Sequence, residues 1–280
     1  MFGKLYVVGT PIGNLGDMSE RMAETLSSVD FIVAEDTRVT SKLLNVLEIK
    51  KPMISYNGYN KDGRGSQIIE RLISGESCAI VSDAGMPCIS DPGVELVALC
   101  TENGIDVISV PGPSALTAAL SISGMYTGRF VFEGFLPVNK KNKLARLNEI
   151  KKFPHTLVFY EAPHKLPDTL KDMLEILGDR KICIVREITK IYEEVIHTTL
   201  CKAVERYNES GPKGEIVVIV EGDKNEPDLC VSLETAAQTA AKLISEGFSA
   251  SDAAKRVSAD TGIKKGDIYR AAVKIAEKPE

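Results

Sequence analysis

The sequence is poor in the residues from which metal sites and disulfide frameworks are built. It has three histidines, none within ligand spacing of another, and its six cysteines include no CxxC pair. We therefore expect no metal centre and no disulfide scaffold. The sequence also lacks any apolar run close to the roughly 20 residues that span a bilayer, and Pro11 interrupts the apolar N-terminus too early for a signal peptide. These absences predict a cytoplasmic protein with reduced thiols and no membrane partner.

The sequence also has no overall excess of basic charge, which would mark a nucleic-acid binder. The net charge is −5, but it is uneven: residues 1–110 carry −6, residues 111–225 carry +2 and residues 226–280 carry −1. The basic side chains of the middle part concentrate in residues 139–152, where Glu149 is the single acid. This basic stretch predicts a solvated helix face or, if it borders an active site, a patch that attracts phosphate.

The first 125 residues alternate strand and helix signals. Short β-branched runs bounded by Gly, Pro or Asp predict buried strands; they are Leu5–Val8, Phe31–Ala34, Ala79–Val81 and Val107–Val110. Helical patterns lie between and after them, at Ser19–Ser27, Val39–Leu47, Gln67–Ile73, Val94–Thr101 and Ser114–Ile122. Ser19 and Ser66 are candidate N-caps. The alternation predicts an open, mostly parallel sheet with helices on both faces, in a domain of residues 1–125.

A second α/β domain is expected at residues 126–224. The apolar segment Arg129–Asn139 breaks the rhythm and is interpreted as the link between the two. Strands are then expected at Thr156–Tyr160, Lys181–Val185, Val195–Thr199 and Glu215–Val220, and helices at Asp168–Leu177 and Lys202–Asn208. Because two β runs follow each other directly after Arg186, we expect this second sheet to be mixed.

The last part of the chain changes in composition. After an acidic spacer at residues 223–228, an alanine-rich segment from Ser232 to Ala276 predicts three helices, with Ser249 capping the second. We expect a small helical module at residues 230–280. The pattern suits a helix-turn-helix module, a bundle that only packs, or a dimerisation arm.

Four loops in the first domain follow strand ends, where open α/β sheets bind ligands. They are Gly9–Gly16, Glu35–Arg38, Ser82–Gly93 and Pro111–Ala115. The third has twelve residues with two Gly, two Pro and two Asp, which is long for a βα connection and indicates function. The second holds either a structural Asp–Arg pair or groups that activate a substrate hydroxyl. These residues alone indicate a ligand-binding α/β enzyme and no more.

Taken together, seven ordered motifs resemble the tetrapyrrole methylase superfamily. They are GTPIGNLGDMS (Gly9–Ser19), EDTR (Glu35–Arg38), SDAGMPCISDPG (Ser82–Gly93), VPGPSA (Val110–Ala115), FEGFLP (Phe132–Pro137), FYEAPHK (Phe159–Lys165) and REITKIYEE (Arg186–Glu194). Within this superfamily the match is close to the branch that methylates a cytidine 2′-hydroxyl of 16S ribosomal RNA. Lys165 departs from it, because the branch more often has arginine there.

This resemblance implies two α/β domains with a ligand cleft between them, a C-terminal helical module, and an S-adenosylmethionine-dependent rRNA (cytidine-2′-O)-methyltransferase. It implies ribosomal RNA or the small ribosomal subunit as partner, and a homodimer. The donor site would consist of Pro11, Ser82, Asp83, Ala84, Gly85, Ile89, Ser114, Ala115, Glu161 and Ala162. The acceptor side would use Glu35, Asp36, Arg38 and Glu187. The basic stretch adds Lys140, Lys141, Lys143 and Arg146 as candidate RNA contacts.

Two other functions remain open from the sequence. A tetrapyrrole C- or N-methyltransferase would keep the fold and change the acceptor, but the SDAGMP loop, the EDTR motif and the helical tail count against it. A non-catalytic RNA-binding or assembly protein could use the same scaffold, although intact loops in both halves count against that.

Overall fold

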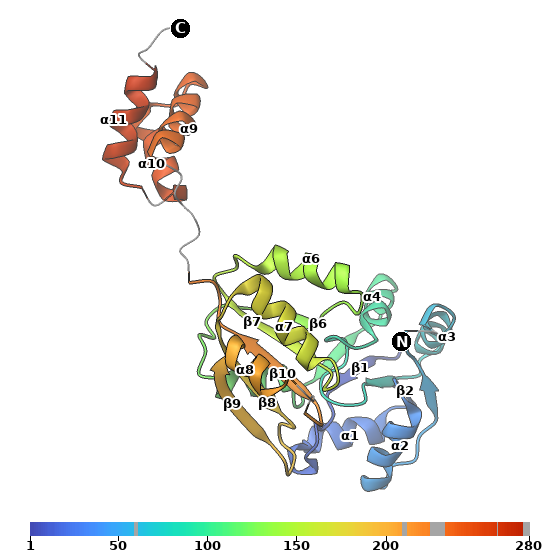
Figure 1. The fold of residues 1–280 in the computed structure, drawn as a ribbon. Helices are drawn as coiled ribbons and strands as arrows, with labels where there is room; N and C mark the ends of the chain where they lie inside the picture. The colour runs from blue at the N-terminus through green and yellow to red at the C-terminus, as the bar shows by residue number, and fades with distance from the viewer. Residues whose placement is uncertain (59–60, 209–211, 225–232, 262, 277–280) are drawn as a thin grey trace. The chain divides into compact units, whose positions relative to one another are not determined.

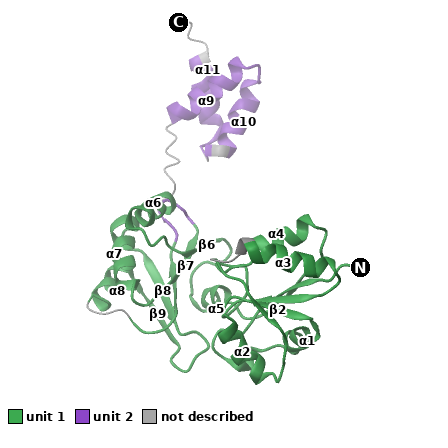
Figure 2. Cartoon of the chain, turned by 90° about the vertical axis from the view of Figure 1, so that its right-hand side faces the viewer, with its two compact units in different colours: residues 1–151, 155–221 green, residues 152–154, 222–280 purple. Residues whose placement is uncertain are grey.

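The computed structural model describes residues 1–58, 61–208, 212–224, 233–261 and 263–276. By its contacts the chain divides into two compact units, residues 1–151 with 155–221, and residues 152–154 with 222–280 (Figure 2). The first unit contains two five-stranded sheets. The predicted boundary between two domains near residue 125 falls inside this unit and stays a prediction. In the described part of the chain, no helix is both long and apolar enough to cross a membrane.

The first sheet is entirely parallel, as predicted, with the order β3-β2-β4-β1-β5. Its strands are β1 (Leu5–Val8), β2 (Phe31–Ala34), β3 (Met53–Ser55), β4 (Cys78–Val81) and β5 (Val107–Val110). Its helices are α1 (Glu20–Ser28), α2 (Thr37–Val46), α3 (Lys61–Ile73), α4 (Val94–Glu102) and α5 (Ala115–Ile122), with a 3-10 turn η1 (Leu15–Asp17) after β1.

Helices cover this sheet on both faces because its strands are apolar on both sides. All four residues of β2 are buried. Ile32 and Ala34 pack toward α1 and α2, while Phe31 and Val33 pack toward α3 and α4. Ser19 caps α1 as predicted, since its side chain accepts a hydrogen bond from the Met22 N–H. The prediction of Ser66 as a cap was wrong, because α3 begins at Lys61 and Ser66 lies inside the helix.

The second sheet is mixed, as predicted, with the order β6-β7-β10-β8-β9. Its strands are β6 (Phe130–Phe135), β7 (Thr156–Glu161), β8 (Lys181–Arg186), β9 (Glu194–Thr199) and β10 (Ile216–Val220), and its helices are α6 (Lys140–Ile150), α7 (Leu166–Leu177) and α8 (Leu200–Arg206). The segment interpreted as a link is therefore largely the edge strand β6, which pairs parallel to β7 with a register shift between Phe132 and Gly134. Helix α5 packs on one face of this sheet, and α7 and α8 lie over the other (Figure 1).

The second unit contains the three predicted helices, α9 (Leu233–Ser245), α10 (Ala250–Thr261) and α11 (Lys265–Ala276). Each contacts the other two, around a core of small side chains such as Ala236, Ala253 and Ala272. Ser249 caps α10, because its hydroxyl accepts a hydrogen bond from the Asp252 N–H. The predicted start at Ser232, together with Cys230 and Gly262, lies outside the described residues.

Candidate functional site

The loops at the carboxyl edge of the first sheet are tied to one another by their backbones. Thr10, after β1, exchanges two hydrogen bonds with Gly85, after β4, at 2.9 and 3.1 Å. Gly9 lies so close to Gly112, after β5, that a Cβ on Gly9 would stand 2.7 Å from the Gly112 backbone. Only glycine permits this approach, so three of the four predicted loops form one rigid wall.

The remaining loop, Glu35–Arg38 after β2, is connected to this wall through two carboxylates. The Asp83 side chain accepts a hydrogen bond from the Asp36 N–H at 3.1 Å, and the Glu35 side chain accepts one from the Asp83 N–H at 3.3 Å. The loop after β4 also holds two non-glycine residues in the left-handed region, Cys88 (φ 67°) and Ser90 (φ 62°). Backbone strain of this kind concentrates at binding sites, where surrounding contacts hold it in place.

A cavity of about 390 Å³ lies between this wall and residues at one edge of the second sheet, where β7 and β8 end and β10 begins. Nine of the predicted site residues line it, namely Glu35, Asp83, Ala84, Gly85, Ile89, Ser114, Ala115, Glu161 and Ala162. The second sheet contributes Tyr160, whose hydroxyl accepts a hydrogen bond from the Leu116 N–H at 3.1 Å. That bond connects the start of α5 to β7, so the two halves of the cavity are joined directly.

Several carboxyl groups line the cavity, and burial raises the pKa of three of them. Burial raises the pKa of Glu35 and of Asp83, and it raises the pKa of Asp91 to about 6, with repulsion from Glu35 as the next cause. Glu161 is also buried, and its carboxylate accepts hydrogen bonds from the Thr169 hydroxyl and the Ala162 N–H. A site of this charge suits a cationic ligand.

Four predicted residues lie beside the cavity rather than on it. Ser82 is buried, and its hydroxyl donates to the Ala84 carbonyl within the loop. Pro11 faces a neighbouring cavity. Asp36 caps α2 and holds the Arg38 guanidinium with both carboxylate oxygens, at 3.0 and 2.6 Å. Of the two readings of this loop, the structural Asp–Arg pair therefore describes Asp36 and Arg38, while Glu35 faces the cavity.

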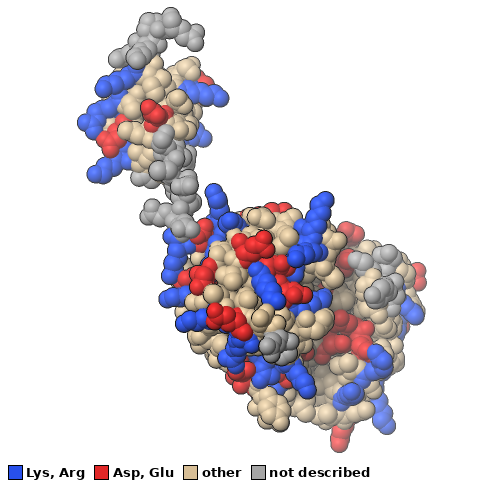
Figure 3. All heavy atoms as spheres, viewed as in Figure 1, with Lys and Arg blue, Asp and Glu red and all other residues tan. Residues whose placement is uncertain are grey.

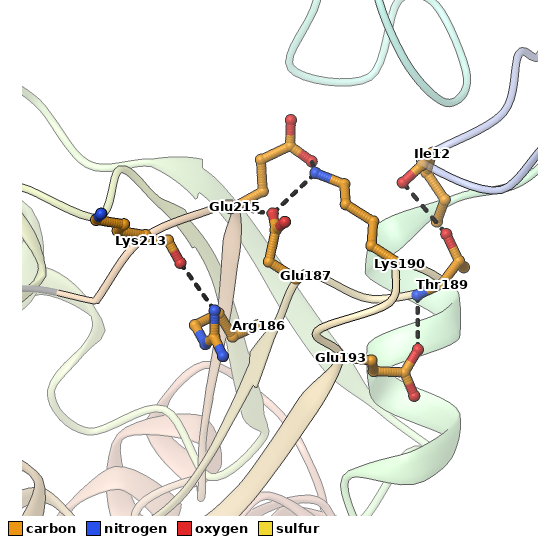
Figure 4. A network of polar contacts seen from close by, with 8 residues as sticks. All are labelled: Ile12, Arg186, Glu187, Thr189, Lys190, Glu193, Lys213 and Glu215. Atoms are coloured by element: carbon orange, nitrogen blue, oxygen red, sulfur yellow. Dashed lines mark hydrogen bonds and ion pairs between the residues drawn. The ribbon is translucent and has the colours of Figure 1, made fainter.

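Glu187 is engaged in a network that fastens the β8–β9 connection (Figure 4). Its carboxylate accepts a hydrogen bond from Lys190 Nζ at 2.8 Å and from the Glu215 N–H at 2.9 Å, and Lys190 lowers its pKa. Next to it, the Thr189 hydroxyl donates to the Ile12 carbonyl at 3.3 Å. These contacts favour a positioning role for Glu187, since they hold the connection against the loop after β1.

The basic stretch forms helix α6, and two of its four candidate RNA contacts are already paired. Lys143 Nζ lies 2.5 Å from the buried carboxylate of Asp172, and Arg146 binds both oxygens of Glu133 at 2.7 and 2.8 Å. Lys140 lies 3.7 Å from Asp172 but is largely exposed, as is Lys141. Figure 3 shows basic and acidic side chains next to each other over α6 and α7. The stretch therefore contributes much less free positive charge than its composition predicts.

Several residues that line the cavity were missed by the sequence analysis. They are Ile12, Met86, Asp91, Phe135, Tyr160, Pro163, Val185, Ile188, Glu215, Ile216 and Val217. Asp91 lies in the loop Ser82–Gly93, whose length indicates function, so its carboxylate could have been recognised as a candidate site residue. Phe135, by contrast, ends a strand that had been interpreted as a link. Ile12 and Met86 lie in loops of the first sheet. The others lie at or near strand ends of the second sheet, where only the pairing of strands shows which side chains reach the cavity.

Comparison with known proteins agrees with this architecture. The family model of the Tetrapyrrole (Corrin/Porphyrin) Methylases matches residues 4–204. Proteins named Ribosomal RNA small subunit methyltransferase I are 48% identical in Halalkalibacterium halodurans, over 95% of this chain and 93% of that protein, and 49% identical in Thermotoga maritima, over 79% and 99%.

Solved structures share the fold at lower identity. Uroporphyrin-III C-methyltransferase from Thermus thermophilus, complexed with S-adenyl homocysteine, superposes with a TM-score of 0.56 at 18% identity, over 79% of this chain and 98% of that one. The methyltransferase CobJ gives a TM-score of 0.59 at 18% identity, over 79% and 94%. The family match covers most of the first unit, and the Halalkalibacterium halodurans relative extends over nearly the whole chain. The chain therefore belongs to the tetrapyrrole methylase family, among the relatives named ribosomal RNA small subunit methyltransferase I.

Proposed function

We propose that the chain transfers a methyl group from S-adenosylmethionine to the 2′-hydroxyl of a cytidine in 16S ribosomal RNA. The observation that carries this proposal is the acidic cavity of about 390 Å³ between the two sheets. It is built from the same loops that match the family, in a chain whose relatives are named for methylating small-subunit RNA. Its volume lies within the range of small-molecule sites.

The residues of the cavity fit a cationic donor. S-adenosylmethionine carries a sulfonium and an ammonium group, and Asp83 and Asp91 offer carboxylates whose ionisation burial disfavours. A bound cation would stabilise their charged forms. Gly85 and Ala84 present backbone with little or no side chain, which allows close approach. When bound, the donor supplies an electrophilic methyl group, and the protein holds the attacking oxygen in line with it.

Glu35 is the residue that we assign as the general base. A 2′-hydroxyl is a weak nucleophile, so a nearby carboxylate that accepts its proton promotes attack on the methyl carbon. The proton passes to Glu35 as the new O–C bond forms and the C–S bond breaks, leaving a neutral thioether. Glu35 suits this step because burial raises its pKa. Asp36 suits it less, because the Arg38 guanidinium lowers its pKa to about 2.

The partners follow from the same proposal. Ribosomal RNA or the small subunit is the substrate, which places the reaction in the cytoplasm. A homodimer is part of the proposal, and the exposed side chains of Ile191 (95%) and Tyr192 (74%) in the β8–β9 connection support it by offering apolar surface to a second copy.

The decisive experiment is mass mapping of small-subunit RNA that lacks the modification, before and after incubation with the protein and S-adenosylmethionine. We expect one new methyl group on the ribose of a cytidine. Methylation of a tetrapyrrole and not of RNA would establish the alternative acceptor. Donor binding without turnover on free RNA or on subunits would instead indicate a non-catalytic RNA-binding protein.

A further inference from the structure

We call the cavity of about 390 Å³ that we propose for S-adenosylmethionine the donor cavity. A second cavity of about 330 Å³ adjoins it on the side of helix α2. It is lined by Thr10, Pro11, Gly13, Leu15, Lys42, Leu43, Val46 and Asp83. Asp83 lines both cavities, and Thr10 is hydrogen-bonded to Gly85 of the donor cavity. A ligand in the second cavity would therefore lie against the same wall as the donor, next to Asp83.

The walls of this second cavity combine exposed apolar side chains with one cation. Leu15 and Val46 are 51% and 54% exposed, large fractions for aliphatic side chains that share a cavity. Lys42 is exposed and has no ion pair or hydrogen bond with another described residue. An apolar surface beside an unpaired ammonium group matches a nucleotide, whose base and ribose are partly apolar and whose phosphate is anionic.

The charges around the two cavities favour Lys42 as the residue that binds a phosphate. The donor cavity is lined by Glu35, Asp83 and Asp91, which repel anions. Arg38 lies one helical turn before Lys42 on α2, but both oxygens of Asp36 already hold its guanidinium. On α6, Lys143 and Arg146 are paired as well. Lys42 thus combines an unpaired charge with a place in a cavity that shares Asp83 with the donor cavity.

We propose that the second cavity is a subsite for a nucleotide of the acceptor RNA that neighbours the methylated one. Lys42 contacts its phosphate, while Leu15 and Val46 contact its ribose or base. This inference rests on the proposed function, since it concerns the RNA substrate of that reaction. The subsite would set the position of the RNA along the site, because a nucleotide held beside α2 directs the adjoining ribose toward Glu35 and the donor.

The test compares Lys42→Gln with Lys50→Gln, a matched change of an exposed lysine shortly after α2 that does not line either cavity. The probe is small-subunit RNA, with methyl transfer and RNA binding measured at several salt concentrations. Loss of one phosphate contact should raise the KM for RNA about tenfold and reduce the slope of log K against log salt by about one. We expect Lys50→Gln to behave as the wild type, and donor affinity to be unchanged in both variants.

A second pair of variants tests the apolar wall. Val46→Asp should raise the KM for RNA, whereas Val46→Leu, which keeps the wall apolar, should not. If the wild type methylates the RNA but Lys42→Gln and Val46→Asp both keep its KM and salt slope, the subsite is wrong and the proposed function stands. If the wild type methylates no small-subunit RNA, the proposed function fails and the subsite fails with it.

Discussion

At the scale of single residues, Gly85 decides whether the loop after β4 can form the donor cavity. Its φ of +81° lies in the left-handed region, and a Cβ there would stand 3.3 Å from Ile12 Cγ2 and 3.6 Å from the Pro113 carbonyl oxygen. Gly85→Val should therefore move the loop, at a cost of about 1–2 kcal/mol in backbone strain. We expect donor affinity, measured by calorimetry, to fall at least about tenfold, which corresponds to that cost.

Gly178→Val is the matched control for this prediction. Gly178 has nearly the same φ, +80°, but it follows helix α7, and a Cβ there would meet nothing within 4 Å. The control should lose stability through backbone strain and keep its donor affinity. Wild-type affinity in Gly85→Val would show that this loop does not hold the donor.

Glu35 and Asp36 are neighbours with different contacts, so they should respond differently to loss of charge. Glu35→Gln removes the proposed base, and we expect turnover to fall by about 10²–10⁴ with donor affinity nearly kept. Asp36→Asn should have a much smaller effect, because asparagine also caps a helix and only the pair with Arg38 is weakened. Single-turnover kinetics measures the rate of methyl transfer in both variants. An equal loss in the two variants would assign the proton transfer to Asp36 or to the pair.

Asp91 should make stability depend on pH in a defined direction. Because burial raises its pKa from 3.8 to about 6, the folded protein binds this proton more tightly than the unfolded chain does. The resulting stabilisation is complete below pH 3.8 and is lost as the pH rises through 6. Asp91→Asn should therefore raise the Tm of the donor-free protein at pH 7.5, leave it nearly unchanged at pH 4, and weaken donor binding. An equal rise at both pH values would contradict the assignment.

At the scale of secondary-structure elements, helix α6 is held by a buried ion pair. Asp172 is 5% exposed, and Lys143, whose side chain is 12% exposed, is its near partner. Lys143→Met keeps the volume but leaves the buried carboxylate with only the distant Lys140, which should cost about 3 kcal/mol. Thermal unfolding should show a Tm lower by roughly 6–12 °C. Lys141→Met, on the same helix and exposed, should change the Tm little; equal losses would refute the buried pair as the cause.

The sequence predicts elements well where one local signal is enough. Strands β1, β2 and β5 have the predicted bounds because each is a short apolar run between turn residues. The strands β3 and β6 were missed, since β3 has three residues and β6 shifts register before Gly134. The loops of the site were predictable because strand ends share one edge of a sheet.

Which of two neighbouring side chains faces the cavity could not be predicted, because contacts between distant residues decide it. Asp36 and Glu35 are adjacent in sequence, yet one caps α2 and the other lines the cavity. Lys143 and Arg146 looked free because their partners, Asp172 and Glu133, lie on other elements. A count of charges along a short stretch of sequence includes neither these ion-pair partners nor their burial.

At the scale of the whole molecule, the helical unit carries a basic part that its near-neutral total hides. Residues 250–276, which comprise α10 and α11, contain six basic and three acidic side chains. Arg270 is paired with Asp267, whereas Lys255 and Lys274 are exposed. The Thermotoga maritima relative aligns over 99% of its length with only 79% of this chain. The part of this chain that it does not match is similar in length to the helical unit.

Deleting residues 226–280 should therefore separate catalysis from RNA affinity. Both sheets and the donor cavity belong to the first unit, which has its own hydrophobic cores. The truncated protein should fold and bind S-adenosylmethionine within about twofold of the full chain, a difference below 0.5 kcal/mol. Its affinity for small-subunit RNA should fall and depend less on salt, because the lysines of α10 and α11 no longer release counterions.

Neutralising Lys140 and Lys141 on α6 is the companion experiment, since these are the two predicted contacts that remain largely exposed. If the helical unit supplies the phosphate contacts, the deletion flattens the salt dependence and the double neutralisation leaves it nearly intact. The opposite result would return RNA binding to the basic stretch on α6 and leave the helical unit as a bundle that only packs. Loss of donor binding on deletion would contradict the independence of the first unit, because no residue of α9, α10 or α11 lines the donor cavity in the described part of the chain.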